Sequence, residues 1–223
     1  MNRFPFAIVG FDLDGTLVDS NRDLAPAINH ALGLIGRAPI SPDATRQLIG
    51  GGARKMLERA VILTGGPVPE AEFEAIHVEL LNHYEAHIAD HTVPYPGCLE
   101  ALDVLAQRGC TLAVVTNKIE VLSRKLLDAL GMTGRFACVI GGDTLGPGRA
   151  KPAPDMIEEA IRRCGGGTFA MVGDSTYDVR AAKAAGVPVV ALSFGYNDVP
   201  AGELGADAVI DDYGDLVPAL ERL

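Results

Sequence analysis

The sequence predicts an α/β protein with a doubly wound, mainly parallel sheet and an inserted all-α helical cap. Short runs rich in valine, isoleucine and alanine recur along the chain, which is typical of parallel strands buried on both faces. Segments with helical spacing separate these runs, and such alternation indicates βαβ units. Residues 20–92 break the alternation, because they contain several helical segments and no convincing strand.

Each strand of the predicted sheet is a short apolar run. Strands are expected at 7–11, 111–115, 136–140, 169–172, 187–192 and 208–210. Helices are expected at 97–108, 119–130, 154–164, 175–185 and 214–222. With 223 residues, the chain is long enough for one large domain or for a domain with a small insertion.

The inserted segment is expected to be helical throughout. Helical spacing of apolar side chains predicts helices at 22–36, at 53–63 and after Pro69. Ser41-Pro42-Asp43 indicates a further helix start, since serine caps a helix and proline suits its first position. We therefore predict a core domain of residues 1–19 and 93–223, and a cap of residues 20–92 that is connected to the core twice.

Composition narrows the class of protein. The net charge of −10 makes nucleic acid or an anionic membrane an unexpected partner, because phosphate backbones are bound by basic surfaces. The four cysteines include no CxxC pair, so a zinc site or a redox dithiol is not expected. No signal peptide is recognisable, and no apolar run reaches the ~18 residues of a membrane span. We expect a soluble, cytoplasmic protein with reduced thiols.

Polar residues follow four of the predicted strands. They are Asp12 and Asp14, then Thr116, Asn117 and Lys118, then Lys151, and finally Asp174 and Asp178. Open parallel sheets bind ligands beyond the carboxyl ends of their strands, so we expect these residues to form one pocket. Their convergence is the main functional signal in the sequence.

The residue types in this pocket suit a phosphoryl group. Two carboxylates beside a buried strand need a compensating cation, and Asp12 with Asp174 could hold Mg²⁺. Lys151 and the Thr116 hydroxyl would supply positive charge and a donor to an anion. Backbone amides of the turn at residues 14–16, which includes Gly15 and Thr16, would add further donors. Phosphoryl transfer depends on such positioning and charge stabilisation.

A nucleophile and a proton carrier are also present. Asp12 could attack phosphorus and form an aspartyl phosphate, which divides a difficult hydrolysis into two easier steps. Asp14 could protonate the leaving alkoxide and then activate water. Both roles require environments that separate the pKa values of the two carboxyl groups.

Four motifs occur in one order along the chain: FDLDGTLVDS at 11–20, VTNK at 115–118, KPAP at 151–154 and GDSTYD at 173–178. Together they resemble the haloacid dehalogenase superfamily of phosphatases, and the resemblance covers essentially the whole chain. It implies that Asp12 is the nucleophile and Asp14 the acid and base. It also implies that Thr116 and Lys151 bind phosphate.

The same resemblance implies a metal site. Mg²⁺ would contact Asp12, the backbone carbonyl of Asp14 and Asp174, and Asp178 would support these ligands without contacting the ion. The insertion after the first motif matches the family's helical cap.

Three further segments, at 49–54, 181–186 and 194–197, resemble the phosphoglycolate phosphatase subfamily. The implied reaction is hydrolysis of 2-phosphoglycolate to glycolate. A pyrophosphatase, or a phosphatase or mutase for a sugar phosphate, remains an alternative. The acid at Asp14 argues against the dehalogenase and phosphonate-cleaving branches, which lack it.

Two alternatives come from other functional classes. A phospho-acceptor signalling module uses a similar acid cluster, but its phosphorylated aspartate ends the third strand, whereas Asp12 ends the first. A binding protein on a disabled phosphatase scaffold would not retain the complete acid, hydroxyl and lysine set. We expect a small phosphorylated metabolite as ligand, and either a monomer or a homodimer.

Two features of the cap have competing interpretations. The glycine run at 50–52 could be a flexible turn, or it could face the pocket so that Arg54 or Lys55 grips the substrate's carboxylate. We favour Arg54, since a planar guanidinium suits a carboxylate. His83, His87 and His91 are spaced like metal ligands on a helix, but packing or hinge contacts are the preferred interpretation.

Overall fold

The computed structural model describes residues 4–223 and contains the predicted parallel sheet. Its strands, in spatial order, are β5 (Cys138–Ile140), β4 (Thr111–Val115), β1 (Ile8–Phe11), β6 (Phe169–Gly173), β7 (Val189–Leu192) and β8 (Ala208–Ile210). All five pairings are parallel. β1 lies between β4 and β6, so the chain winds outward from it in both directions. A ligand site is expected at this switch point.

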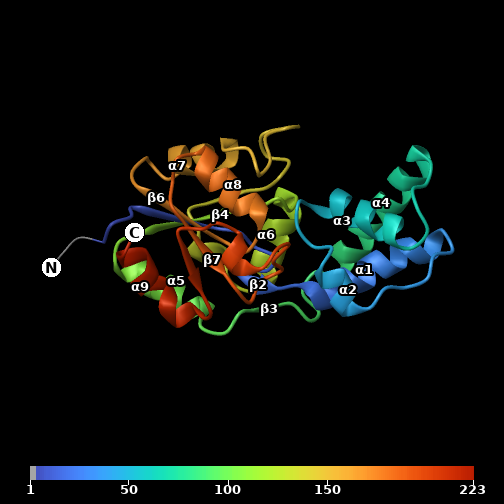
Figure 1. Ribbon diagram of the computed structural model, residues 1–223, viewed down its shortest axis with the longest axis horizontal. Coiled ribbons are helices and arrows are strands. Elements are labelled where there is room, and N and C mark those ends of the chain that lie inside the picture. The colour runs from blue at the N-terminus through green and yellow to red at the C-terminus, as the bar shows by residue number, and fades with distance from the viewer. Residues whose placement is uncertain (1–3) are drawn as a thin grey trace.

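Helices cover both faces of the sheet, as Figure 1 shows. They are α5 (Cys98–Gln107), α6 (Glu120–Ala129), α7 (Asp155–Arg163), α8 (Thr176–Ala184) and α9 (Leu216–Glu221), with 3₁₀ turns at Thr133–Arg135, Ala201–Glu203 and Tyr213–Asp215. Alternate side chains of β1 enter different cores. Ile8 packs with residues of α7 and α8, whereas Val9 and Phe11 pack with residues of α5, α6 and α9.

The strand bounds differ slightly from those predicted. β5 begins two residues later than expected, at Cys138, although the Ala137 backbone N–H already donates to the Leu112 carbonyl of β4 at 2.8 Å. β7 begins after Pro188, and a proline has no backbone N–H to donate within a sheet. Among the helices described here, none is long and apolar enough to cross a membrane.

Residues 20–92 form the predicted helices. These are α1 (Asn21–Leu34), α2 (Pro42–Arg46), α3 (Ala53–Leu63) and α4 (Glu70–Ala86), and Figure 1 shows them together at one end of the molecule. Pro42 occupies the first turn of α2, and the Ser41 hydroxyl accepts from the Ala44 backbone N–H at 3.2 Å. We propose that these helices are a cap domain that moves relative to the sheet.

The connection between cap and core is a short antiparallel ladder that sequence patterns did not indicate. β2 (Val18–Asp19) pairs with β3 (Val93–Pro94). The buried Asp23 carboxylate, at the start of α1, accepts from the backbone N–H groups of His91 and Thr92 and from the Thr92 hydroxyl. Asp23 therefore joins the two connections into one unit.

Loss of the Asp23 carboxylate should destabilise the protein. In Asp23→Ala, buried N–H and O–H donors lose their acceptor, and we expect the free energy of unfolding to fall by about 2–4 kcal/mol. Denaturant unfolding monitored by circular dichroism measures the change. Glu58→Ala, at an exposed site on α3, is the matched control and should change stability by less than about 0.5 kcal/mol. Equal effects of the two variants would contradict the anchoring role.

Candidate active site

The carboxyl ends of β1, β4 and β6 bring together residues from distant parts of the sequence. Asp12 follows β1 and Thr116 follows β4. Asp174 follows β6, and Asp178 lies in the first turn of α8. Carboxylate oxygens of Asp12, Asp174 and Asp178 lie within 4.8 Å of one another. The predicted convergence is therefore present in the structure.

This carboxylate cluster is deficient in positive charge. Burial raises the pKa of Asp12 to about 6, Lys151 opposes the shift, and Asp178 adds to it. Burial raises the pKa of Asp174 well above its ordinary value, and the charges of Asp178 and Asp12 raise it further. Only Lys151 forms ion pairs with these carboxylates among residues 4–223. A buried group of hard oxygen donors with surplus negative charge fits a hard divalent cation.

Lys151 is held in the middle of the cluster. Its ammonium donates to Asp178 Oδ1 at 2.5 Å and to the Val115 carbonyl at 2.7 Å, and it lies 3.1 Å from Asp12 Oδ1. Its side chain is 1% exposed. The Asn117 side-chain amide donates to the Lys151 carbonyl at 2.9 Å, which fixes the loop that carries the lysine.

Asp178 joins the cluster to the start of α8. Its Oδ2 accepts from the Ser175 backbone N–H at 3.0 Å and from the Ser175 hydroxyl at 2.6 Å, while its Oδ1 accepts from Lys151. A capping box of this kind holds a helix start in place. Asp178 thus orients both Lys151 and the turn that carries Asp174.

The turn after Asp14 packs against Asp174. Gly15 has a φ of +82°, and a Cβ there would lie 2.3 Å from Asp174 Oδ2, so a side chain would collide with the carboxylate. The Thr16 hydroxyl donates to Asp174 Oδ1 at 2.8 Å, and the Tyr196 backbone N–H donates to Oδ2 at 2.6 Å. Both groups orient Asp174.

Asp14 pairs with Lys118, which was predicted to lie in the pocket but was given no role there. Lys118 Nζ lies 2.9 Å from Asp14 Oδ2, and the Ser20 hydroxyl donates to Asp14 Oδ1 at 2.6 Å. Burial opposes the charge on Lys118, but the Asp14 carboxylate and Tyr84 together outweigh it and raise the pKa of the ammonium. The sequence feature that could have identified Lys118 as a site residue is its place in the VTNK motif, directly after Thr116 and Asn117.

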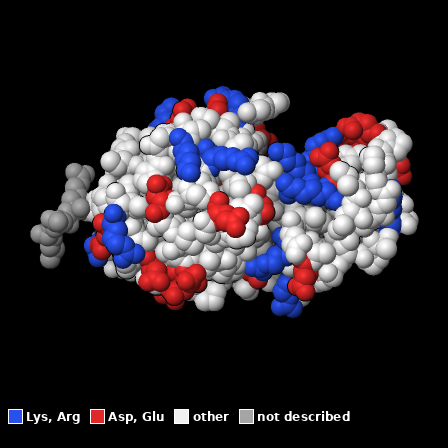
Figure 2. Space-filling view, viewed as in Figure 1, with Lys and Arg blue, Asp and Glu red and all other residues white. Residues whose placement is uncertain are grey.

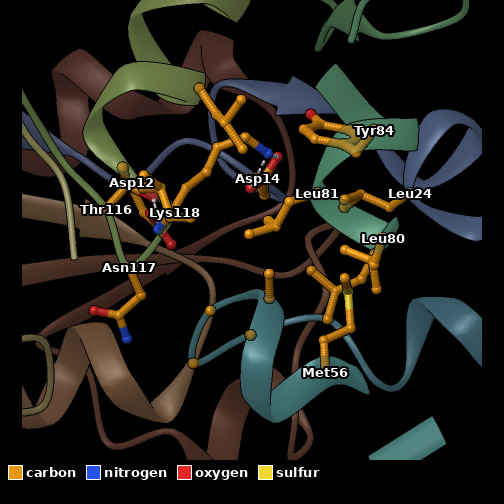
Figure 3. Close-up of a pocket in the computed structure, with 17 residues that line it drawn as sticks. Asp12, Asp14, Leu24, Met56, Leu80, Leu81, Tyr84, Thr116, Asn117 and Lys118 are labelled. Carbon is orange, nitrogen blue, oxygen red and sulfur yellow. Dashed lines mark hydrogen bonds and ion pairs between the residues drawn. The ribbon is translucent and has the colours of Figure 1, made fainter. Parts of the chain in front are cut away.

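A cavity of about 60 Å³ lies between the carboxylates and the cap (Figure 3). Asp12, Asp14, Thr116, Asn117 and Lys118 line it from the core. The cap contributes α4 side chains, Met56 of α3 and the glycines 50–52 before that helix. At roughly 10–15 Å³ per water-sized group, this space holds about four to six such groups. The pocket therefore has room for a small ligand.

The glycine loop of the cap lies directly against the core. A Cβ on Gly52 would be 3.1 Å from the Asn117 carbonyl, and one on Gly51 would be 2.8 Å from the Tyr177 hydroxyl. Arg59 holds the loop there, since it donates to the Gly50 carbonyl at 3.0 Å and to the Tyr177 hydroxyl at 3.0 Å. The glycine loop therefore covers one side of the pocket.

The structure does not bring Arg54 to this site. Its guanidinium is exposed, forms ion pairs with Glu70 and Glu74, and lies over the Phe73 ring. Arg54 lines a separate cavity between α3 and α4. Lys55 lies over the Tyr177 ring, 5.0 Å from its centroid. Contact between the substrate and Arg54 or Lys55 stays a prediction, and the positions of these two side chains do not support it.

The cap histidines pack together on α1 and α4. His83 stacks on His30, with ring centroids 4.7 Å apart, and lies 4.8 Å from His87. No sequence pattern indicated that His30 packs with these histidines. His91 lies in the connection back to the core, where its backbone N–H donates to Asp23.

The doubly wound parallel sheet, with an acid cluster at its switch point, places the chain among the α/β proteins that bind a ligand at the carboxyl ends of their strands. The family described as haloacid dehalogenase-like hydrolase matches residues 9–192. The chain belongs to this family.

Individual relatives match over nearly the whole chain. A phosphoglycolate phosphatase from Agrobacterium fabrum is 45% identical over 218 residues, which are 97% of this chain and 92% of that protein. One from Mesorhizobium japonicum is 40% identical over 219 residues, which are 97% of this chain and 96% of that protein. The crystal structure of a predicted phosphoglycolate phosphatase from Haemophilus somnus has a TM-score of 0.89 at 33% identity, covering 96% of this chain and 97% of that chain.

Proposed function

We propose that this protein is a Mg²⁺-dependent phosphatase that hydrolyses 2-phosphoglycolate to glycolate through an aspartyl-phosphate intermediate. The observation that carries the proposal is the cluster of Asp12, Asp174, Asp178 and Lys151, of which Asp12 lines the same small cavity as Asp14. The substrate is supported by the names of the relatives from Agrobacterium fabrum and Mesorhizobium japonicum.

Mg²⁺ suits the donor set. Asp12, Asp174 and the Asp14 carbonyl would hold the ion, and Asp178 would support them. Mg²⁺ prefers oxygen ligands and keeps room for water and phosphate oxygens. When bound, the ion would neutralise charge on the phosphoryl oxygens.

In the first half-reaction, Asp12 attacks phosphorus while the bond to the leaving oxygen breaks. Asp12 Oδ1 already accepts from the Leu13 backbone N–H at 2.7 Å and faces Lys151, which leaves Oδ2 for the attack. Asp14 donates a proton to the leaving alkoxide. Lys151 and the Thr116 hydroxyl stabilise charge on the transferring group, with backbone amides of the turn that contains Gly15 and Thr16.

In the second half-reaction, water attacks the aspartyl phosphate, and Asp14 accepts its proton. Phosphate leaves, and Asp12 is regenerated as a carboxylate. The closed cap excludes bulk water during transfer, so it must open for product release.

The proposed partner is a small phosphorylated metabolite. Figure 2 shows acidic and basic side chains interspersed over the face in view, and the whole chain carries a net charge of −10. Cytoplasmic location, and a monomeric or homodimeric state, stay predictions.

A panel of phosphorylated metabolites assayed with Mg²⁺ tests the function. We expect the highest kcat/KM for 2-phosphoglycolate and many turnovers per chain. A preference for hexose phosphates or pyrophosphate would contradict the substrate but not the chemistry. Retention of a single phosphate per chain would instead indicate a phospho-acceptor module.

The metal site should respond to pH in a defined direction. The pKa of Asp12 is about 6 in the folded protein, against 3.8 ordinarily, because burial outweighs the effect of Lys151. Between these values the folded state binds more protons than the unfolded state, so stability without metal falls as pH rises from about 4 to about 6. Mg²⁺ competes with those protons.

We therefore expect Mg²⁺ to raise the Tm more at about pH 7 than at about pH 5. Differential scanning calorimetry with and without Mg²⁺ measures the difference. Asp211→Asn, which changes an exposed carboxylate outside the cluster, should keep the same response. Equal increases in Tm at both pH values would contradict the prediction.

A further inference from the structure

Tyr84 has a buried hydroxyl group that the proposed chemistry does not use. The residue is 2% exposed, lies on α4 and lines the same cavity as Asp12 and Asp14. No residue among 4–223 forms a hydrogen bond with this hydroxyl. Figure 3 shows it on the side of the ring that faces Asp14 and Lys118. An unpartnered hydroxyl is costly in a buried site, which indicates that a ligand supplies its partner.

The Lys118 ammonium lies over the ring that carries this hydroxyl. It is 4.2 Å from the centroid of the Tyr84 ring, and its side chain is 7% exposed. An ammonium has three N–H donors, and within the described chain its hydrogen bonds go to Asp14 alone. Lys118 therefore retains donor capacity on the side of the cavity that Tyr84 lines.

A second source of positive charge, besides the Lys118 ammonium, is the start of α3. This 11-residue helix has no side-chain cap, because its N-cap is Gly52, and its first turn contains no acidic residue. The first N–H groups of a helix lack partners within the helix, and its N-terminal end carries partial positive charge. Gly52 and Ala53 both line the cavity.

The remaining walls are apolar, with Met56, Leu80 and Leu81 closing the space around these donors. A low-dielectric enclosure strengthens attraction between the ammonium and an anion. One ammonium and one hydroxyl match the two oxygens of a carboxylate, whereas a second phosphate carries more charge and more acceptors than these groups serve. The cavity volume of about 60 Å³ also favours the smaller anion.

We propose that Lys118, Tyr84 and the N-terminus of α3 bind the carboxylate of the substrate while its phosphoryl group faces Asp12. This inference rests on the proposed phosphatase function and assigns the part of the site that selects the leaving group. Lys118 comes from the core, whereas Tyr84 and α3 come from the cap. The carboxylate therefore bridges cap and core, and only a substrate short enough to reach both ends stabilises the closed state.

The test compares 2-phosphoglycolate with 2-phosphoglycolamide, in which the carboxylate is replaced by a neutral amide of nearly the same shape. Wild-type protein should prefer the acid. Tyr84→Phe keeps the ring and removes only the hydroxyl, so the preference in kcat/KM should fall about tenfold, as for a lost hydrogen bond to a charged group. Lys118→Met should reduce it further. Tyr95→Phe removes another unpartnered buried hydroxyl, outside this cavity, and should leave the preference unchanged.

Binding gives a readout that does not need turnover. In an Asp12→Asn background with Mg²⁺, calorimetric titration should show that Tyr84→Phe weakens binding of 2-phosphoglycolate about tenfold and leaves binding of the amide unchanged. Equal losses for both compounds, or no loss for either, would overturn the carboxylate assignment. Preference for a diphosphorylated compound that depends on Tyr84 would also overturn it.

The two proposals can fail separately. If wild-type protein hydrolyses both compounds equally well, the carboxylate subsite is refuted and the phosphatase chemistry stands. If it hydrolyses neither, but the Asp12→Asn protein binds the acid over the amide through Tyr84, the function is refuted and the subsite stands.

Discussion

Asp12→Asn should lose at least about 10⁴-fold in kcat, because an amide cannot form the phosphorylated intermediate. The loss should occur in a folded protein. Asparagine has the shape of aspartate and no charge, and the raised pKa of Asp12 shows that the ionised form is disfavoured without metal. We therefore expect the metal-free variant to be at least as resistant to denaturant at neutral pH as the wild-type protein.

Acid quench during a single turnover should trap phosphate covalently on wild-type protein and not on Asp12→Asn. Circular dichroism and denaturant unfolding check the fold of the variant. Asp211→Asn is the control for loss of a carboxylate elsewhere, and it should retain wild-type kcat. Steady-state turnover by Asp12→Asn at a rate near wild type would refute the role of Asp12 as nucleophile.

Lys151→Met should be the second most damaging substitution. It preserves most of the side-chain volume but removes the only ammonium that pairs with Asp12 and Asp178 in the described chain. Loss of a donor aimed at the transferring group typically costs about 10²–10³-fold in kcat. Stability should also fall by about 3–5 kcal/mol, because buried carboxylates are left without their cation.

The loss of stability in Lys151→Met should depend on pH. Lys151 opposes the rise in the pKa of Asp12, so its removal raises that pKa further. Protonation of Asp12 then relieves more of the lost stability in the variant than in the wild type. Destabilisation should therefore be smaller at about pH 5 than at about pH 7.5. Denaturant unfolding at both pH values measures it, with Lys183→Met, an exposed lysine on α8, as control. A pH-independent loss would argue against charge compensation by Lys151.

Sequence patterns predicted the positions of the acids because topology makes strand ends meet. Once Asp12 and Asp174 were placed at the carboxyl ends of parallel strands, a shared site followed from the fold class and needed no knowledge of side-chain packing. The structure shows that the two strands, β1 and β6, are neighbours. Lys151 was predicted to join them by its place after the third strand. The roles of these residues in the reaction stay predictions.

The contacts of the cap could not be derived in the same way. Arg54 was expected to line the pocket, but its position around the axis of α3 places its guanidinium beside Glu70 and Glu74 of α4. These ion pairs depend on how α3 and α4 pack against each other. The spacing of apolar residues along either helix does not specify that packing. The β2–β3 ladder was also missed, since two-residue strands carry no periodicity that identifies them.

The sequence by itself determined the order of strands and helices and the chemical types at the strand ends, because both follow from local patterning and a small set of allowed topologies. Only the tertiary structure decided which donors face the cavity. In the structure, Arg54 pairs with Glu74 and Lys118 pairs with Asp14. The Tyr84 hydroxyl has no hydrogen-bond partner among residues 4–223. These outcomes depend on the packing of cap against core, where small rotations of a helix select a different neighbour for each side chain.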